Sequence, residues 1–97
     1  MRAEEARPRL AALGFRPEDV EVLADHFLSV EEQGRAGHGL TRIEWLEGWP
    51  ELNPEARPRR VLREPGYERW DGNGALGYLV LDQIVRSTLE EIGRAHV

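Results

Sequence analysis

The 97-residue chain contains no cysteine and no lysine. The lack of cysteine excludes disulfides, thiolate nucleophiles and zinc ribbons, and the three histidines, His26, His38 and His96, are too scattered to form a metal cage. We therefore expect no metal site. No apolar run approaches the roughly 20 residues that span a bilayer, and "MRAEEARPRL" lacks an apolar signal segment. The expectation is a cytoplasmic protein with no membrane contact.

Positive charge is scarce as well. Thirteen arginines face eighteen acidic residues, which gives a net charge of −5, and the arginines are spread among carboxylates. Such a surface repels phosphate backbones, so no nucleic-acid partner is expected. The length and the 40% hydrophobic content allow one modest core.

Three N-terminal helices are predicted from caps and apolar spacing. The first runs from about Pro8 to a stop at Gly14, and the third covers "LTRIEWLEGW" and ends before Pro50. The second begins at Pro17, with two acids in its first turn, and ends near Gly34. Its apolar face is the clearest in the chain and comprises Val20, Leu23, Ala24, Phe27 and Val30.

A short edge hairpin and a last helix follow. "RVLRE" and "YERW" read as strands separated by Pro65 and Gly66. From Ala75 the chain is apolar over a wide arc, so we expect a buried helix, although this small chain offers little to bury it. The predicted class is α+β and predominantly helical. An apolar helix that lacks a packing partner in so small a chain suggests a fragment of a larger protein.

The last six residues, "IGRAHV", support a fragment. They can be encoded as ATC GGA AGA GCA CAC GTC, which resembles read-through of a common sequencing-library adapter. We therefore expect residues 1–91 to be native and residues 92–97 to be a non-native tail, so that His96 has no role. The alternative is a natural helix end at Gly93.

The loop "GRAGHGLTR" holds the strongest candidate site. With a helix starting near Leu40, His38 lies at its entry and Arg42 one turn in, so both can face one point together with the free N–H groups of the first turn. A carboxylate or phosphate would be bound there, and His38 could give a proton to a 2-oxo acid. The alternative is a surface turn, with Arg42 in a solvated ion pair with Glu44 or Glu47.

The other candidate functional motifs and residues have weaker support. "DGNGALG" has neither a lysine nor the GxGxxG order of a phosphate loop, and a turn leading into the last helix is favoured. His26 is expected to be structural. The tryptophans at 45, 49 and 70 are expected in a core or an interface.

Three segments in order carry a family resemblance: "LAALGFRPEDVEVLADHFLSVEEQGRAGHGLTRI", "NPEARPRRV" and "DGNGALGYLV". Together they resemble the N-terminal region of the malate/L-lactate dehydrogenase family of non-Rossmann fold, which includes ureidoglycolate dehydrogenase, sulfolactate dehydrogenase and piperideine-carboxylate reductase. The resemblance spans residues 8–91. It implies a truncated α/β oxidoreductase whose parent, a homodimer of about three times this length, transfers hydride between NAD or NADP and a small 2-oxo/2-hydroxy acid.

The resemblance also implies roles for two residues. His38 matches a histidine assigned in some members as proton donor, and Arg42 matches an arginine implicated in binding the substrate carboxylate or the cofactor. Gly37 stands where a serine is usual, so a relay through that hydroxyl is absent. No residue is assigned to cofactor binding, and the fragment alone is expected to be inactive. The competing hypothesis is a small free-standing helical module that docks its last helix on a partner.

Overall fold

The computed structural model describes residues 1–34 and 39–95. The chain divides into two compact units, Met1–Glu55 and Ala56–Val97, each of which is described by itself. Across the described part, helices dominate and the one sheet has two strands, which confirms the predicted α+β, mainly helical class. No helix there is both long and apolar enough to cross a membrane.

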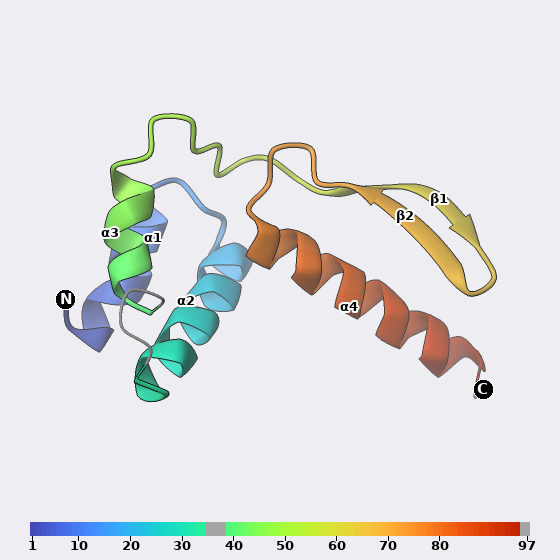
Figure 1. Cartoon of the computed structure of the whole chain (residues 1–97), viewed down its shortest axis with the longest axis horizontal. Helices are drawn as coiled ribbons and strands as arrows, with labels where there is room; N and C mark the ends of the chain where they lie inside the picture. The colour runs from blue at the N-terminus through green and yellow to red at the C-terminus, as the bar shows by residue number, and fades with distance from the viewer. Residues whose placement is uncertain (35–38, 96–97) are drawn as a thin grey trace. The chain divides into compact units, whose positions relative to one another are not determined.

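Unit 1 is helical. A 3₁₀ turn, Ala3–Glu5, leads into α1 (Ala6–Ala12), which is followed by α2 (Pro17–Glu32) and α3 (Thr41–Glu47) (Figure 1). The first helix thus starts two residues before the predicted Pro8. That proline is tolerated because the first N–H groups of a helix have no intrahelical partner. Gly14, with φ 103°, follows α1 as predicted.

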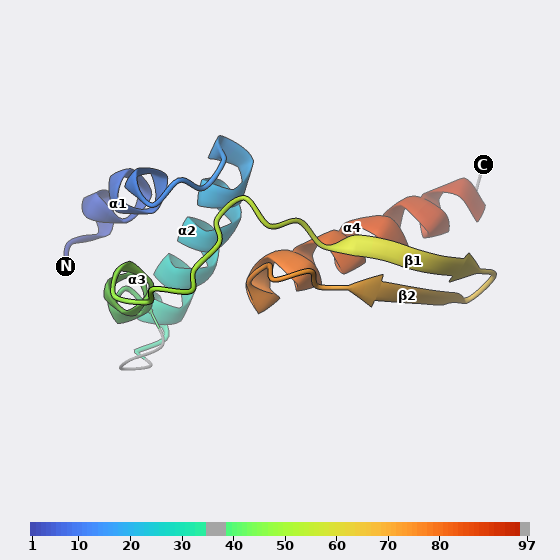
Figure 2. The same ribbon diagram turned by 90° about the horizontal axis from the view of Figure 1, so that it is seen from above.

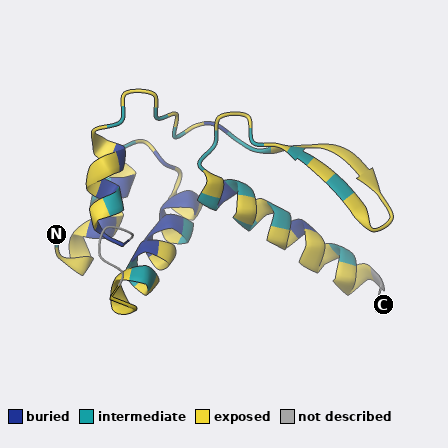
Figure 3. Ribbon diagram, viewed as in Figure 1, coloured by how far each residue is buried: buried dark blue, intermediate teal, exposed yellow. Residues whose placement is uncertain are grey.

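The core of unit 1 lies between these helices. Most of the apolar face predicted for α2 is confirmed, since Val20, Leu23, Ala24 and Phe27 are buried, whereas Val30 is half-buried. α1 packs against α2 and α3 and adds Ala6 and Leu10, while α3 adds Ile43 and Leu46 (Figures 2 and 3). At the surface, the Arg9 guanidinium donates to the Glu47 carboxylate, with Nε 2.9 Å from Oε2, which ties α1 to α3.

Unit 2 consists of the hairpin β1 (Arg59–Glu64) and β2 (Tyr67–Asp71) and the helix α4 (Gly77–Ala95). The strands are antiparallel, and Glu64 pairs with Tyr67 across a two-residue turn in which Gly66 has φ 73°. Proline followed by a left-handed glycine suits a type II turn. A bulge at Val61 breaks the register. Both predicted strands are confirmed to within one residue.

The predicted last helix is present, but only one of its sides is buried as expected. Leu79 is buried, whereas four large apolar side chains of α4 are between 47% and 62% exposed. The cover available within unit 2, a two-stranded hairpin, is too narrow for a helix that is apolar around a wide arc. α4 continues past Gly93 to Ala95, so the helix does not end at Gly93, and the assignment of residues 92–97 to a non-native tail stays a prediction.

Candidate functional site

The glycine loop connects α2 to α3, and its two described ends explain two of its glycines. Gly34 has φ 74° and its N–H donates to the Glu31 carbonyl, which is the left-handed ending expected after a helix. Gly39 lies against α2, where an added Cβ would be 2.9 Å from the Cβ of Glu31 and 3.0 Å from its Cα. Gly39 is therefore required by close packing of the loop on the helix.

His38 and Gly37 lie outside the described residues, so the predicted juxtaposition of His38 with Arg42 stays a prediction. Arg42 itself is described, in the first turn of α3.

The expectation of free N–H groups at the start of α3 is wrong for three residues. The Leu40 N–H donates to the Glu31 carboxylate, with 2.9 Å between nitrogen and oxygen. The Arg42 and Ile43 N–H groups donate to the carbonyls of Gly39 and Leu40, each at 3.0 Å. A side chain 9 residues away in sequence already supplies the negative charge that favours a helix start. α3 has only seven residues, so its own dipole is small.

The Arg42 side chain lies across an aromatic surface. Its guanidinium carbon is 5.5 Å from the centre of the Trp45 ring, and Trp45 stacks on Trp49 at 5.2 Å between ring centres. The predicted ion pair with Glu47 is not the observed arrangement, since Arg9 binds that carboxylate. Within residues 1–34 and 39–95, the buried Nε of Arg42 has no hydrogen-bond acceptor. A donor in that condition favours an anionic partner at this point.

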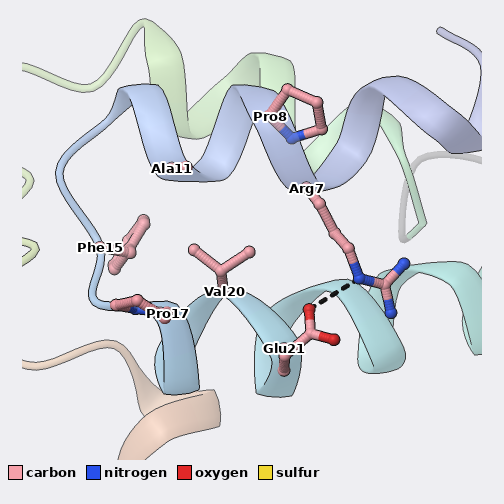
Figure 4. Close-up of a pocket in the computed structure, with 7 residues that line it drawn as sticks. All are labelled: Arg7, Pro8, Ala11, Phe15, Pro17, Val20 and Glu21. Atoms are coloured by element: carbon pink, nitrogen blue, oxygen red, sulfur yellow. Dashed lines mark hydrogen bonds and ion pairs between the residues drawn. The ribbon is translucent and has the colours of Figure 1, made fainter.

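A hollow of about 420 Å³ lies between α1 and the start of α2 (Figure 4). Its walls are largely apolar, and at its edge the Arg7 Nε donates to the Glu21 carboxylate at 2.7 Å. Because these two charges neutralise each other, the hollow suits a small apolar group and not a carboxylate substrate. Its lining residues are Arg7, Pro8, Ala11, Phe15, Pro17, Val20 and Glu21.

A polar cluster that the sequence reasoning missed joins the hairpin to α4. The Glu68 carboxylate accepts from the Ser87 hydroxyl at 2.7 Å and from the Trp70 indole N–H at 3.0 Å, and Arg60 donates to Ser87 at 3.0 Å. The hydrogen bonds from Trp70 and then Ser87 hold the pKa of Glu68 below its usual range. The available signal was the i, i+2 spacing of Glu68 and Trp70, which places both on one face of a strand.

The segment "DGNG" is a turn, as favoured from the sequence. Asn73 has φ 53° and its N–H donates to the Asp71 carboxylate at 2.9 Å, while its amide donates to the Arg57 carbonyl at 3.3 Å. These bonds from Asn73 give the segment a structural role as the turn that precedes α4. His26 is exposed and its ring meets Phe27 edge-on at 5.6 Å. Within the described ranges, no group of three acidic or histidine side chains could hold a metal ion.

Comparison with known proteins identifies a set of related reductases. The chain is 29% identical over 85 residues to 2,3-diketo-L-gulonate reductase of Citrobacter koseri, a match that covers 84% of this chain and 25% of that protein. The proteins of the same name from Klebsiella pneumoniae (28% over 81 residues; 79% of this chain and 24% of the relative) and Mannheimia succiniciproducens (29% over 85 residues; 84% and 25%) are similar to the same degree. The chain thus spans about a quarter of the length of the curated relatives it matches.

No family profile matches the chain. No solved structure matches it either. The similarity to reductases therefore rests on the aligned sequences, which cover most of this chain.

Proposed function

We propose that this chain is the N-terminal part of an oxidoreductase that transfers a hydride between NAD or NADP and a small 2-oxo/2-hydroxy acid, within the malate/L-lactate dehydrogenase family of non-Rossmann fold. The observation that carries the proposal is the similarity of 84% of the chain to a named reductase. Because that relative is about four times as long as the matched stretch, the parent is proposed to be a longer protein. The family resemblance is the basis for proposing that the parent is a homodimer. The 97 residues alone are inactive under this proposal.

Arg42 is proposed to bind the carboxylate of the substrate. Its buried Nε lacks an acceptor within residues 1–34 and 39–95, and its guanidinium is held over Trp45. A guanidinium fixed in this way keeps a planar, bidentate geometry suited to a carboxylate. The Glu31 carboxylate lies next to the start of α3, where it accepts a hydrogen bond from the Leu40 N–H. Among the described contacts, it does not occupy the place proposed for the substrate carboxylate on Arg42.

His38 is proposed to give a proton to the substrate oxygen, as the resemblance implies. Its place in the sequence, four residues before Arg42, supports the proposal that both serve one substrate. With Gly37 in the position usual for serine, His38 acts without a neighbouring hydroxyl. NAD or NADP would supply the hydride when bound. We assign no described residue to the cofactor, because the Asn73 N–H of the turn at Asp71–Gly74 is already bonded to Asp71, and we propose that the rest of the parent binds it.

Kinetics of the full-length parent test these roles. His38→Ala should lower kcat by about 10²- to 10⁴-fold, the usual worth of a positioned proton donor. Arg42→Ala should raise KM for a 2-oxo acid by roughly 10- to 100-fold through loss of charge-assisted hydrogen bonds. Arg69→Ala, which removes an exposed arginine of β2, is the control and should change neither constant.

Wild-type kinetics in both variants would remove His38 and Arg42 from the site. A parent that reduces no 2-oxo acid with either nicotinamide cofactor would defeat the proposed function as a whole.

The exposed apolar residues of α4 favour a second candidate, a free-standing helical module that docks on another protein. The two candidates differ in the source DNA. Native codons for residues 92–97 followed by a native stop codon would favour the module, whereas a reading frame that continues from residue 91 would favour the reductase.

A further inference from the structure

α4 carries two apolar faces, and the hairpin covers one of them. On the covered face, Val80 and Ile84 border a hollow of about 500 Å³ beside β2, and Ser87 donates to Glu68 of that strand. The second face follows the spacing i, i+4, i+8, i+11, and its large apolar side chains are exposed. We call it the outer α4 face; it consists of Leu81, Val85 and Leu89 within the residues expected to be native, and Ile92 extends it in the 97-residue chain.

The spacing of the outer α4 face is that of a helix seam. Side chains three and four residues apart line up along one side of a helix and pack together into a partner surface. Exposures of 62% at Leu81, 47% at Val85 and 62% at Leu89 leave large side chains in contact with water. A row of this length on a soluble protein marks a site of contact with other polypeptide.

The charges next to this face indicate what the partner is made of. Within the residues expected to be native, Arg86 donates to Asp82 at 2.8 Å, so these two groups are neutralised within α4 itself. The partner surface therefore needs no complementary charge and is apolar. A second copy of the chain is disfavoured because each copy carries a net charge of −5.

We propose that the outer α4 face is covered, in the full-length parent, by the polypeptide that follows residue 91. This inference rests on the proposed function, which makes the chain the first part of a longer reductase. The relatives support it in one respect, since three-quarters of their length lies outside the matched stretch and is available to form this cover.

Thiol labelling tests the proposal, because the chain has no cysteine of its own. Val85→Cys is made in the 97-residue chain and in the parent, and both are reacted with N-ethylmaleimide. The thiol should react about tenfold or more slowly in the parent, since only local opening then exposes it. Gln83→Cys, exposed on another side of α4, is the matched control and should react at similar rates in both proteins.

Equal rates at position 85 in the two proteins would overturn the proposal. So would slow labelling of the 97-residue chain that speeds up on dilution, which would identify a second copy as the cover. Leu81→Cys is the second variant should Val85→Cys fail to fold. Reductase activity is assayed on the same parent preparation: a protected thiol without activity refutes the proposed function alone, and a reactive thiol in an active enzyme refutes this inference alone.

Discussion

Gly39 shows how one missing side chain lets two segments meet. An added Cβ would approach the Cβ of Glu31 to 2.9 Å and its Cα to 3.0 Å, and backbone cannot move aside as the end of a side chain can. The same approach brings the Leu40 N–H within 2.9 Å of the Glu31 carboxylate. The start of α3 and the last turn of α2 therefore depend on a glycine at this position.

We predict that Gly39→Ala lowers the free energy of unfolding by about 1–3 kcal/mol, the usual cost of overpacking. Urea unfolding of the 97-residue chain measures it. Gly48→Ala is the matched control, because Gly48 has φ −93° and an added Cβ would be 3.8 Å from its nearest neighbour. Its effect should be near zero or slightly stabilising. Equal stability of the two variants would show that the loop does not pack closely on α2.

Arg42 shows the limit of sequence reasoning about a single residue. Its place in the first turn of α3 was predictable, but its contact with Trp45 was not, because an arginine three residues before a tryptophan can equally turn toward a carboxylate. The carboxylate weighed for it, Glu47, is bound by Arg9 from 38 residues away. No pattern in the sequence around Arg42 indicates that the distant Arg9 takes the Glu47 carboxylate.

At the scale of elements, the hairpin and α4 are joined by one carboxylate. Glu68 receives hydrogen bonds from Trp70 and Ser87, and these lower its pKa. A carboxyl group with a lower pKa in the folded state stabilises that state above its unfolded pKa of about 4.3. That contribution is lost as the pH falls from this value through the folded pKa.

We therefore predict that acid weakens the packing of the hairpin on α4 below about pH 4.3. Glu68→Gln should lower the urea midpoint at pH 7, and the difference from wild type should disappear as the pH falls past the folded pKa. Glu64→Gln, at an exposed position in β1, is the control and should leave the midpoint nearly unchanged. A Glu68→Gln deficit that persists undiminished in acid would contradict the assigned charge effect.

Elements governed by local rules were predictable, and elements governed by distant contacts were not. The Pro65–Gly66 turn and the period of Val20, Leu23 and Phe27 place the hairpin and α2 correctly, because turn chemistry and helix spacing are local. The start of α1 and the bulge at Val61 escaped prediction, since a 3₁₀ turn and a register shift leave weak local signals. Of the candidate site, the sequence supplied Arg42 but neither Glu31 nor the cluster around Glu68.

At the scale of the whole molecule, surface charge opposes association through the outer α4 face. The net charge of −5 at pH 7 falls toward zero as carboxylates gain protons, at about pH 5. Mutual repulsion of the chains is then lost while Leu81 and Leu89, each 62% exposed, remain accessible.

We predict that the 97-residue chain associates most strongly near pH 5, as measured by light scattering across a pH series. Leu89→Glu should reduce scattering severalfold because it removes an apolar contact. Gln83→Glu introduces the same charge on another side of α4 and should reduce it far less. Equal suppression by both variants would assign the association to net charge and not to the outer α4 face.

The ion pair of Arg9 with Glu47 has a consequence for the order of folding. It closes a loop of 38 residues that contains all of α2, and such a closure carries an entropy cost of about 3 kcal/mol. Contacts between α1 and α2 span a shorter stretch and can form before it. We expect the pair to form late, so that Arg9→Ala speeds unfolding of unit 1 in a stopped-flow measurement and leaves its folding rate nearly unchanged.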